Sequence, residues 1–125
     1  MPADRTLDLA ASPLLDPDVY RDLWALLGAE QMDRLLVRLE RQLATAFAQD
    51  DAAVANRSDL AREAHSLVSQ AGMLGFLEFA ETCRELEAVC LGEDDAARWL
   101  DEARLARDRA VKEIGRLRGA SKSVT

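Results

Sequence analysis

Apolar residues recur along most of this 125-residue chain at the three- and four-residue spacing of an amphipathic helix. No segment alternates apolar and polar residues with the two-residue period of a strand. The pattern predicts a short first helix followed by four longer ones. Their expected ranges are 16–28, 29–49, 58–74, 76–91 and 94–119.

Residues that begin and end helices support these boundaries. Asp16 can cap the free N–H groups of a helix start, and Pro17 fits the first helical position. Ser58 is expected to cap the third helix in the same way. Glycines follow the apolar stripes where helix ends are expected, at Gly28, Gly75, Gly92 and Gly119.

Each predicted helix presents one apolar stripe, which we expect to be buried. On the first helix the stripe is formed by Val19, Leu23, Leu26 and Leu27. On the fourth helix it is formed by Phe76, Ala80, Cys83, Glu87 and Cys90, and it therefore includes a carboxylate. A buried carboxylate without a hydrogen-bond partner costs on the order of several kcal/mol. We therefore expect Glu87 to find a partner on a neighbouring helix.

Amphipathic helices joined by short connections bury their stripes most simply against one another. We therefore predict an all-α fold, an antiparallel up-down four-helix bundle with a short N-terminal capping helix. Residues 1–15 are expected to form a flexible N-terminal arm, 16–119 the bundle and 120–125 a disordered tail. The length of the chain corresponds to one ordinary domain.

The net charge of −7 argues against nucleic acid as a partner, because phosphate binding needs a concentrated positive surface. The longest uncharged stretch is residues 64–77, whereas a membrane-spanning helix needs about 20 apolar residues. The first eight residues contain three charges, which is not typical of a signal peptide. We therefore expect a cytoplasmic protein that does not bind membranes.

Metal and haem sites of helical bundles are not supported by the residues present. A carboxylate-bridged di-iron site needs two Glu-x-x-His pairs, and the chain has one histidine, His65. A zinc site would have to combine His65 with Cys83 and Cys90, which have no persuasive ligand spacing. The two cysteines lie about 10 Å apart along one predicted helix, too far for a disulfide. We expect no cofactor, no metal and two reduced cysteines in the core.

His65 is predicted to project from the solvent-facing side of the third helix. At 100° per residue from Leu60, the apolar stripe spans about 80° and His65 lies at about 140°. Most of its neighbours on this face are small or modest in size: Ala61, Arg62, Val68, Ser69 and Gly72. A glycine within a helix costs roughly 1 kcal/mol relative to alanine, so Gly72 indicates that something approaches the backbone here.

Glu87 is the expected partner of His65. In two antiparallel helices that turn at Gly75, His65 lies ten residues before the turn and Glu87 twelve after it, so the two side chains can be level. Glu87 could accept a hydrogen bond from one ring nitrogen and leave the other exposed. Such a bond would fix the tautomer of a nucleophile.

Two segments resemble the signature of histidine-containing phosphotransfer (HPt) domains. The first is Ala-His-Ser-Leu-Val-Ser-Gln-Ala-Gly-Met-Leu-Gly at 64–75, and the second is Cys-Arg-Glu-Leu-Glu at 83–87. The family pattern runs Ala-His-x-Leu-Lys-Gly, then a glycine ten residues after the histidine, then Cys-x-x-Leu-Glu. The positions in register are His65, Leu67, Gly75, Cys83, Leu86 and Glu87. The resemblance covers most of residues 15–118.

This resemblance implies a phosphorelay carrier. His65 would accept a phosphoryl group from a receiver-domain phosphoaspartate and pass it to another receiver aspartate, with Glu87 orienting the imidazole. The implied partners are response-regulator receiver domains and a hybrid histidine kinase, with Mg²⁺ on the receiver. The chain would be a phosphocarrier without a nucleotide or metal site, not an enzyme, and we expect a monomer. Gly75 would be structural, and the partner-binding residues would be Ala61, Val68, Ser69 and Gly72.

Two positions depart from the family pattern. Val68 stands where the resemblance would place a lysine, and Ser69 stands where it would place a glycine. The missing cation leaves two possibilities: Arg62, one turn before His65, stabilises the phosphoryl charge, or transfer is slow and selective. The alternative function is a non-phosphorylated HPt-like interaction module that binds receiver domains or kinases.

Overall fold

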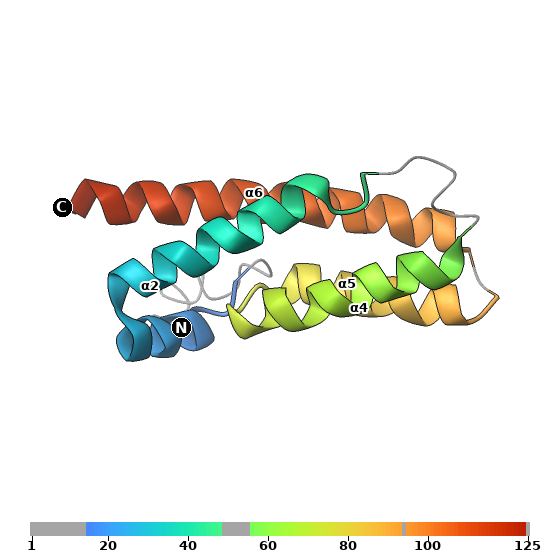
Figure 1. Cartoon of the computed structure of the whole chain (residues 1–125), viewed down its shortest axis with the longest axis horizontal. Coiled ribbons are helices and arrows are strands. Elements are labelled where there is room, and N and C mark those ends of the chain that lie inside the picture. The colour runs from blue at the N-terminus through green and yellow to red at the C-terminus, as the bar shows by residue number, and fades with distance from the viewer. Residues whose placement is uncertain (1–14, 49–55, 94, 125) are drawn as a thin grey trace, which may run out of the picture.

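The computed structural model describes residues 15–48, 56–93 and 95–124. Within these ranges the chain forms helices α2 (Pro17–Thr45), α4 (Arg57–Met73), α5 (Leu77–Leu91) and α6 (Ala96–Val124), and no strands. Figure 1 shows the helices lying alongside one another. The predicted all-α class is confirmed. None of the helices in these ranges is both long and apolar enough to cross a bilayer.

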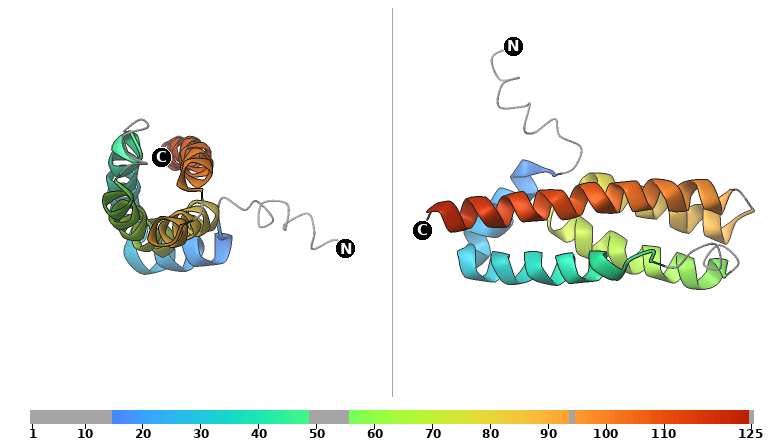
Figure 2. Two further views of the ribbon diagram at one scale, coloured as in Figure 1. Left: turned by 90° about the vertical axis from the view of Figure 1, so that its right-hand side faces the viewer. Right: turned by 90° about the horizontal axis from the view of Figure 1, so that it is seen from above.

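The core lies between the four helices (Figure 2). α4 packs on α5, α5 packs on α6, and α2 contacts both α6 and α4. The apolar stripe predicted on the second helix is buried at Met32, Leu36, Leu39 and Leu43. The largest side chains that are almost fully buried include Phe47, Phe76 and Phe79. Among the described residues no polar or charged side chain belongs to the buried class, as expected for an apolar bundle core.

α2 contains the first two predicted helices, which meet at Gly28. Gly28 has φ +85° and ψ 166°, so the helix is interrupted there, as the sequence predicted. Asp16 caps the N-terminus: its Oδ1 accepts hydrogen bonds from the N–H groups of Asp18 (3.0 Å) and Val19 (3.3 Å). Residues 17–27 form a separate N-terminal segment of α2, before the kink.

Three of the four residues in the stripe predicted on this N-terminal segment are exposed, so that prediction is wrong in part. Leu26 is 79% exposed, and Val19 and Leu27 are also exposed. The kink at Gly28 gives the segment a direction different from that of the rest of α2, and Leu23 of the predicted stripe packs against the core together with Tyr20. Leu15 is buried, although the arm was expected to include it. The rest of that predicted arm, residues 1–14, lies outside the described residues.

Gly75 joins the N-terminal segment to the turn between α4 and α5. Its φ of +91° is a left-handed conformation that favours glycine. Its carbonyl oxygen accepts a hydrogen bond of 2.7 Å from the N–H of Asp16. A Cβ atom at this position would lie 3.0 Å from the carbonyl oxygen of Asp16 and 3.4 Å from the Cβ of Val19. Both the backbone conformation and the close approach of α2 therefore require glycine.

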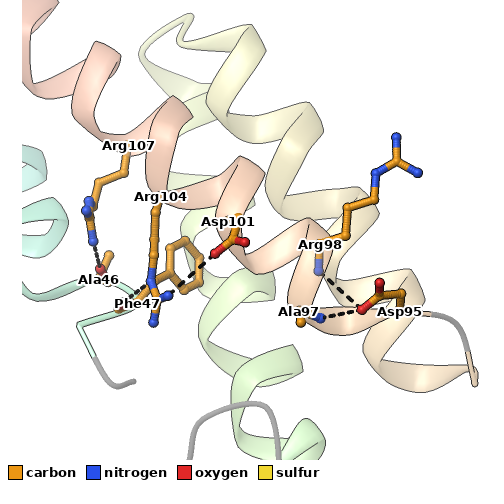
Figure 3. A network of polar contacts seen from close by, with 8 residues as sticks. All are labelled: Ala46, Phe47, Asp95, Ala97, Arg98, Asp101, Arg104 and Arg107. Carbon is orange, nitrogen blue, oxygen red and sulfur yellow. Dashed lines mark hydrogen bonds and ion pairs between the residues drawn. The ribbon is translucent and has the colours of Figure 1, made fainter. Parts of the chain in front are cut away.

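The C-terminus of α2 is set by arginines of α6. The helix ends at Thr45, four residues before the predicted end. Arg107 Nη1 donates to the carbonyl oxygen of Ala46 (2.9 Å), and Arg104 Nε donates to that of Phe47 (3.0 Å) (Figure 3). These carbonyls lie where a helix end leaves acceptors unpaired. Hydrogen bonds from α6 thus satisfy these carbonyl groups, and the last turn predicted for the helix does not form.

The starts of α4 and α6 are capped by different residue types. Asn56, not Ser58, caps α4, because its side chain accepts from the N–H of Asp59. The predicted cap at Ser58 is therefore wrong. Asp95 caps α6, whose start was predicted near residue 94, with Oδ1 accepting from the N–H groups of Ala97 (3.1 Å) and Arg98 (3.3 Å) (Figure 3).

α6 extends beyond its predicted end at Gly119. The backbone is helical through Val124, so the tail predicted to be disordered from residue 120 is helical over 120–124. Thr125 lies outside the described residues. A Cβ atom at Gly119 would meet nothing within 4 Å, and a glycine of ordinary helical φ costs only about 1 kcal/mol without ending a helix. Arg118 also ties this region to α2 through Asp33 (2.9 Å).

Candidate functional site

The site lies on the antiparallel pair formed by α4 and α5, which lie side by side in Figure 1. A Cβ atom at Gly72 would lie 3.9 Å from the Cβ of Ala80, close to the turn. Further from the turn, His65 of α4 contacts Glu87 of α5. In both pairs the α5 residue lies two positions further from Gly75 than the α4 residue, so the two helices keep the same register from the turn to His65.

His65 is exposed and paired with Glu87. The Nδ1 atom of His65 lies 2.9 Å from Oε2 of Glu87, and the side chains are 72% and 25% exposed. An ionised carboxylate can only accept a hydrogen bond, so Nδ1 carries the proton. In a neutral imidazole the other nitrogen, Nε2, then keeps its lone pair. The exposure and the pairing both agree with the sequence analysis.

Glu87 was predicted to lie in the buried stripe of its helix, but the buried residue is its neighbour Leu86. Leu86 is fully buried together with Phe79 and Cys83, and Glu87 lies at the edge of this apolar face. The face is broad because α5 packs against both α4 and α6, so its centre is not the centre of the predicted stripe. As a result, the carboxylate of Glu87 reaches the surface, where it can hold the ring of His65.

The residues predicted to bind a partner differ in exposure. Ala61 is buried in the core, at 5% exposure, so this assignment is wrong. It belongs to the apolar core cluster. Val68 is half-buried and packs against the core, Gly72 is half-buried, and Ser69 is exposed. The exposed margin next to His65 is therefore formed by Ser69 with the edges of Val68 and Gly72.

Gly72 is not required by packing inside the protein. The nearest atom to an added Cβ would be that of Ala80 at 3.9 Å, which is an ordinary contact. An alanine would fit at this position and would favour the helix by about 1 kcal/mol. The interior gives no reason for glycine here, which is consistent with a close approach from outside.

Arg62 is not directed to His65 in this structure. Its guanidinium group forms an ion pair with Asp59, one turn earlier on α4. Among the described contacts none joins Arg62 to the imidazole. The structure therefore does not bring this predicted charge stabiliser to the ring.

The two cysteines are free and buried, as expected. Burial, with a smaller contribution from the negative charge of Glu63, raises the pKa of Cys83 to about 12. Burial also raises the pKa of Cys90. Both thiols are therefore protonated near neutral pH, which makes them poor nucleophiles. In the described part of the chain, no three His, Cys, Asp or Glu side chains are grouped to hold a metal ion.

Sequence reasoning overlooked Arg84 of α5. Its side chain is 56% exposed and forms an ion pair with Glu81. It precedes Glu87 by three residues, so it lies about one turn away on the same side of α5. This spacing from Glu87 was the available signal in the sequence.

The comparison with known families agrees with this geometry. The sequence profile described as "Hpt domain" matches residues 25–122, which is most of the chain. No curated protein and no solved structure gives a significant match. The match includes His65, Glu87 and the turn between their helices. The chain belongs to the Hpt domain family, whose members are phosphocarriers in the phosphorelays of two-component systems.

Proposed function

We propose that His65 is the phosphoacceptor, and that it receives its phosphoryl group from the phosphoaspartate of one receiver domain and passes it to the aspartate of another. The observation that carries this proposal is the exposed imidazole whose Nδ1 lies 2.9 Å from Glu87. It is also the only histidine in the chain. A hybrid histidine kinase and response-regulator receivers are the proposed partners, and a monomer is sufficient for this role.

The transfer uses the lone pair of Nε2. This nitrogen attacks the phosphorus in line, forming an N–P bond, while the P–O bond to the receiver aspartate breaks. The bonding electrons leave with the aspartate as a carboxylate. The imidazole keeps its Nδ1 proton and gains positive charge. Mg²⁺ bound by the receiver would supply positive charge to the phosphoryl oxygens.

Glu87 acts on the ring and not on the phosphoryl group. Its carboxylate fixes the Nδ1-protonated tautomer before transfer. After transfer the same carboxylate faces a positively charged ring, which strengthens the hydrogen bond. The onward step reverses these changes when the second receiver aspartate attacks the phosphorus.

The fold supports this role by holding the site on rigid helices. We infer an antiparallel up-down bundle in which residues 17–27 cap one end, supported by the hydrogen bond from Asp16 to Gly75. The proposed docking surface is the exposed margin formed by Val68, Ser69 and Gly72 on α4. Small side chains there leave room for a receiver to bring its aspartate to His65.

Val68 favours a second candidate function. A family member without the lysine at this position could bind receivers or kinases without accepting phosphate, because the developing charge has one cation fewer beside it. This is the interaction-module alternative. Transfer and binding distinguish the two functions.

Incubation with a receiver carrying labelled phosphoaspartate tests the proposal. We expect label to move to this chain, to be lost on brief acid treatment as phosphohistidine is, and to move onward when a second, unphosphorylated receiver is added. A receiver that binds but transfers no label would contradict the proposal and favour the interaction module.

A further inference from the structure

We infer that Arg84 of α5 supplies the cation beside the phosphoryl group that Val68 cannot supply from α4. This inference rests on the proposed transfer to His65. The guanidinium group would contact the phosphoryl oxygens as the N–P bond forms, without taking part in bond making or breaking.

Arg84 lies on the side of α5 that borders α4. Ala80 and Glu87 both face α4, as their contacts with Gly72 and His65 show. At 100° per residue, Arg84 lies about 40° from Ala80, on the side away from the buried core. Arg84 therefore stands at the outer edge of the contact with α4, on the surface that His65 shares.

Arg84 is also level with Val68 along the helix pair. Arg84 lies three residues from Glu87 towards the turn, a rise of about 4.5 Å. On α4 the corresponding step of three residues from His65 leads to Val68. Arg84 thus lies across the helix contact from the position where the family resemblance places a lysine. A cation is present at the same level, but on the other helix.

Arg62 differs from Arg84 in its position relative to the contact between α4 and α5. Both Arg62 and Val68 are about 60° from His65 around α4, but on opposite sides. Val68 packs towards the core on the α5 side, whereas Arg62 is exposed on the far side. The bond from Glu87 holds the ring at the α5 side. The ring is therefore joined to α5, whereas Arg62 is paired with Asp59 and makes no described contact with the ring.

Arg84 is also available for a new partner. Its ion pair with Glu81 joins two side chains that are 56% and 66% exposed. Ion pairs this exposed contribute little to stability, so Arg84 can exchange Glu81 for a phosphoryl group at a small cost in free energy. A guanidinium group can give two parallel hydrogen bonds to phosphoryl oxygens, which a single ammonium point charge does not.

An Arg84→Gln variant tests this inference. We expect its single-turnover transfer rate at saturating phosphorylated receiver to fall about tenfold, as for loss of one charge-assisted hydrogen bond at a partly exposed site. Receiver affinity and thermal midpoint are expected to stay close to wild type. Arg62→Gln is the matched control and is expected to keep its rate within about twofold.

Rescue by a cation on α4 provides the decisive comparison. Adding Val68→Lys to the Arg84→Gln variant is expected to restore most of the lost rate, because it returns a positive charge at the same level. Three results would each overturn the role of Arg84. These are a wild-type transfer rate in Arg84→Gln, an equal loss of rate in Arg62→Gln, and no recovery of the rate when Val68→Lys is added. These results leave the proposed function standing. Absence of label on the wild-type chain would instead contradict the proposed function and this inference together.

Discussion

Replacing His65 with glutamine is expected to abolish transfer of the phosphoryl group to this chain while leaving its fold intact. The chain has no second histidine that could accept the group instead. Glutamine is similar in size and polar, but its amide nitrogen has no available lone pair for attack on phosphorus. Because the imidazole is 72% exposed, the free energy of unfolding should change by no more than about 0.5 kcal/mol.

Label transfer from a phosphorylated receiver, combined with circular dichroism, measures both parts of this prediction. Ser66→Ala is a matched control, since Ser66 is exposed on the same helix and next to His65. The control is expected to transfer at nearly the wild-type rate. Acid-labile label on the glutamine variant would mean that another side chain accepts the group.

Replacing Leu86 with alanine is expected to lower the free energy of unfolding by about 3 kcal/mol, because it leaves a cavity in a fully buried part of the core. The neighbouring change Glu87→Ala removes a carboxylate at the surface. It should lower stability by less than about 1 kcal/mol. The two variants should rank the other way in phosphoryl transfer. Glu87→Ala is expected to slow transfer, whereas the folded Leu86→Ala protein is expected to transfer at the wild-type rate.

Urea denaturation of the two variants measures the stability difference, and transfer at low temperature, where the Leu86→Ala protein is folded, measures the rates. The pair is well matched because the two residues are adjacent on α5. Equal destabilisation by both changes would show that Glu87 belongs to the core, as the predicted stripe implied. It would also remove the distinction between a packing residue and an orienting one.

Much of the site could be predicted because it depends on local periodicity and one turn. The spacing of apolar residues predicted α4 and α5, and the distances of His65 and Glu87 from Gly75 predicted that they would be level. Gly75 was recognisable because a left-handed residue commonly ends a helix. These inferences need only the helix repeat and an antiparallel turn.

The parts that could not be predicted depend on contacts between distant segments. A helical wheel does not show that α5 packs on two neighbours, so the predicted buried stripe included Glu87 and omitted Leu86. For the same reason Ala61 was predicted to lie on the surface. The end of α2 depends on Arg104 and Arg107, more than fifty residues away in sequence. Likewise, the position of Arg84 opposite Val68 appears only when the helices are paired.

Identifying the atom that carries the phosphoryl group tests most directly whether His65 is the phosphoacceptor. Phosphorus–proton correlation NMR on the phosphorylated chain distinguishes attachment at Nε2 from attachment at Nδ1. We expect phosphorus on Nε2 of His65, with the Nδ1 proton still present and hydrogen-bonded to Glu87. Phosphorus on Nδ1, or on any side chain other than His65, would contradict the account.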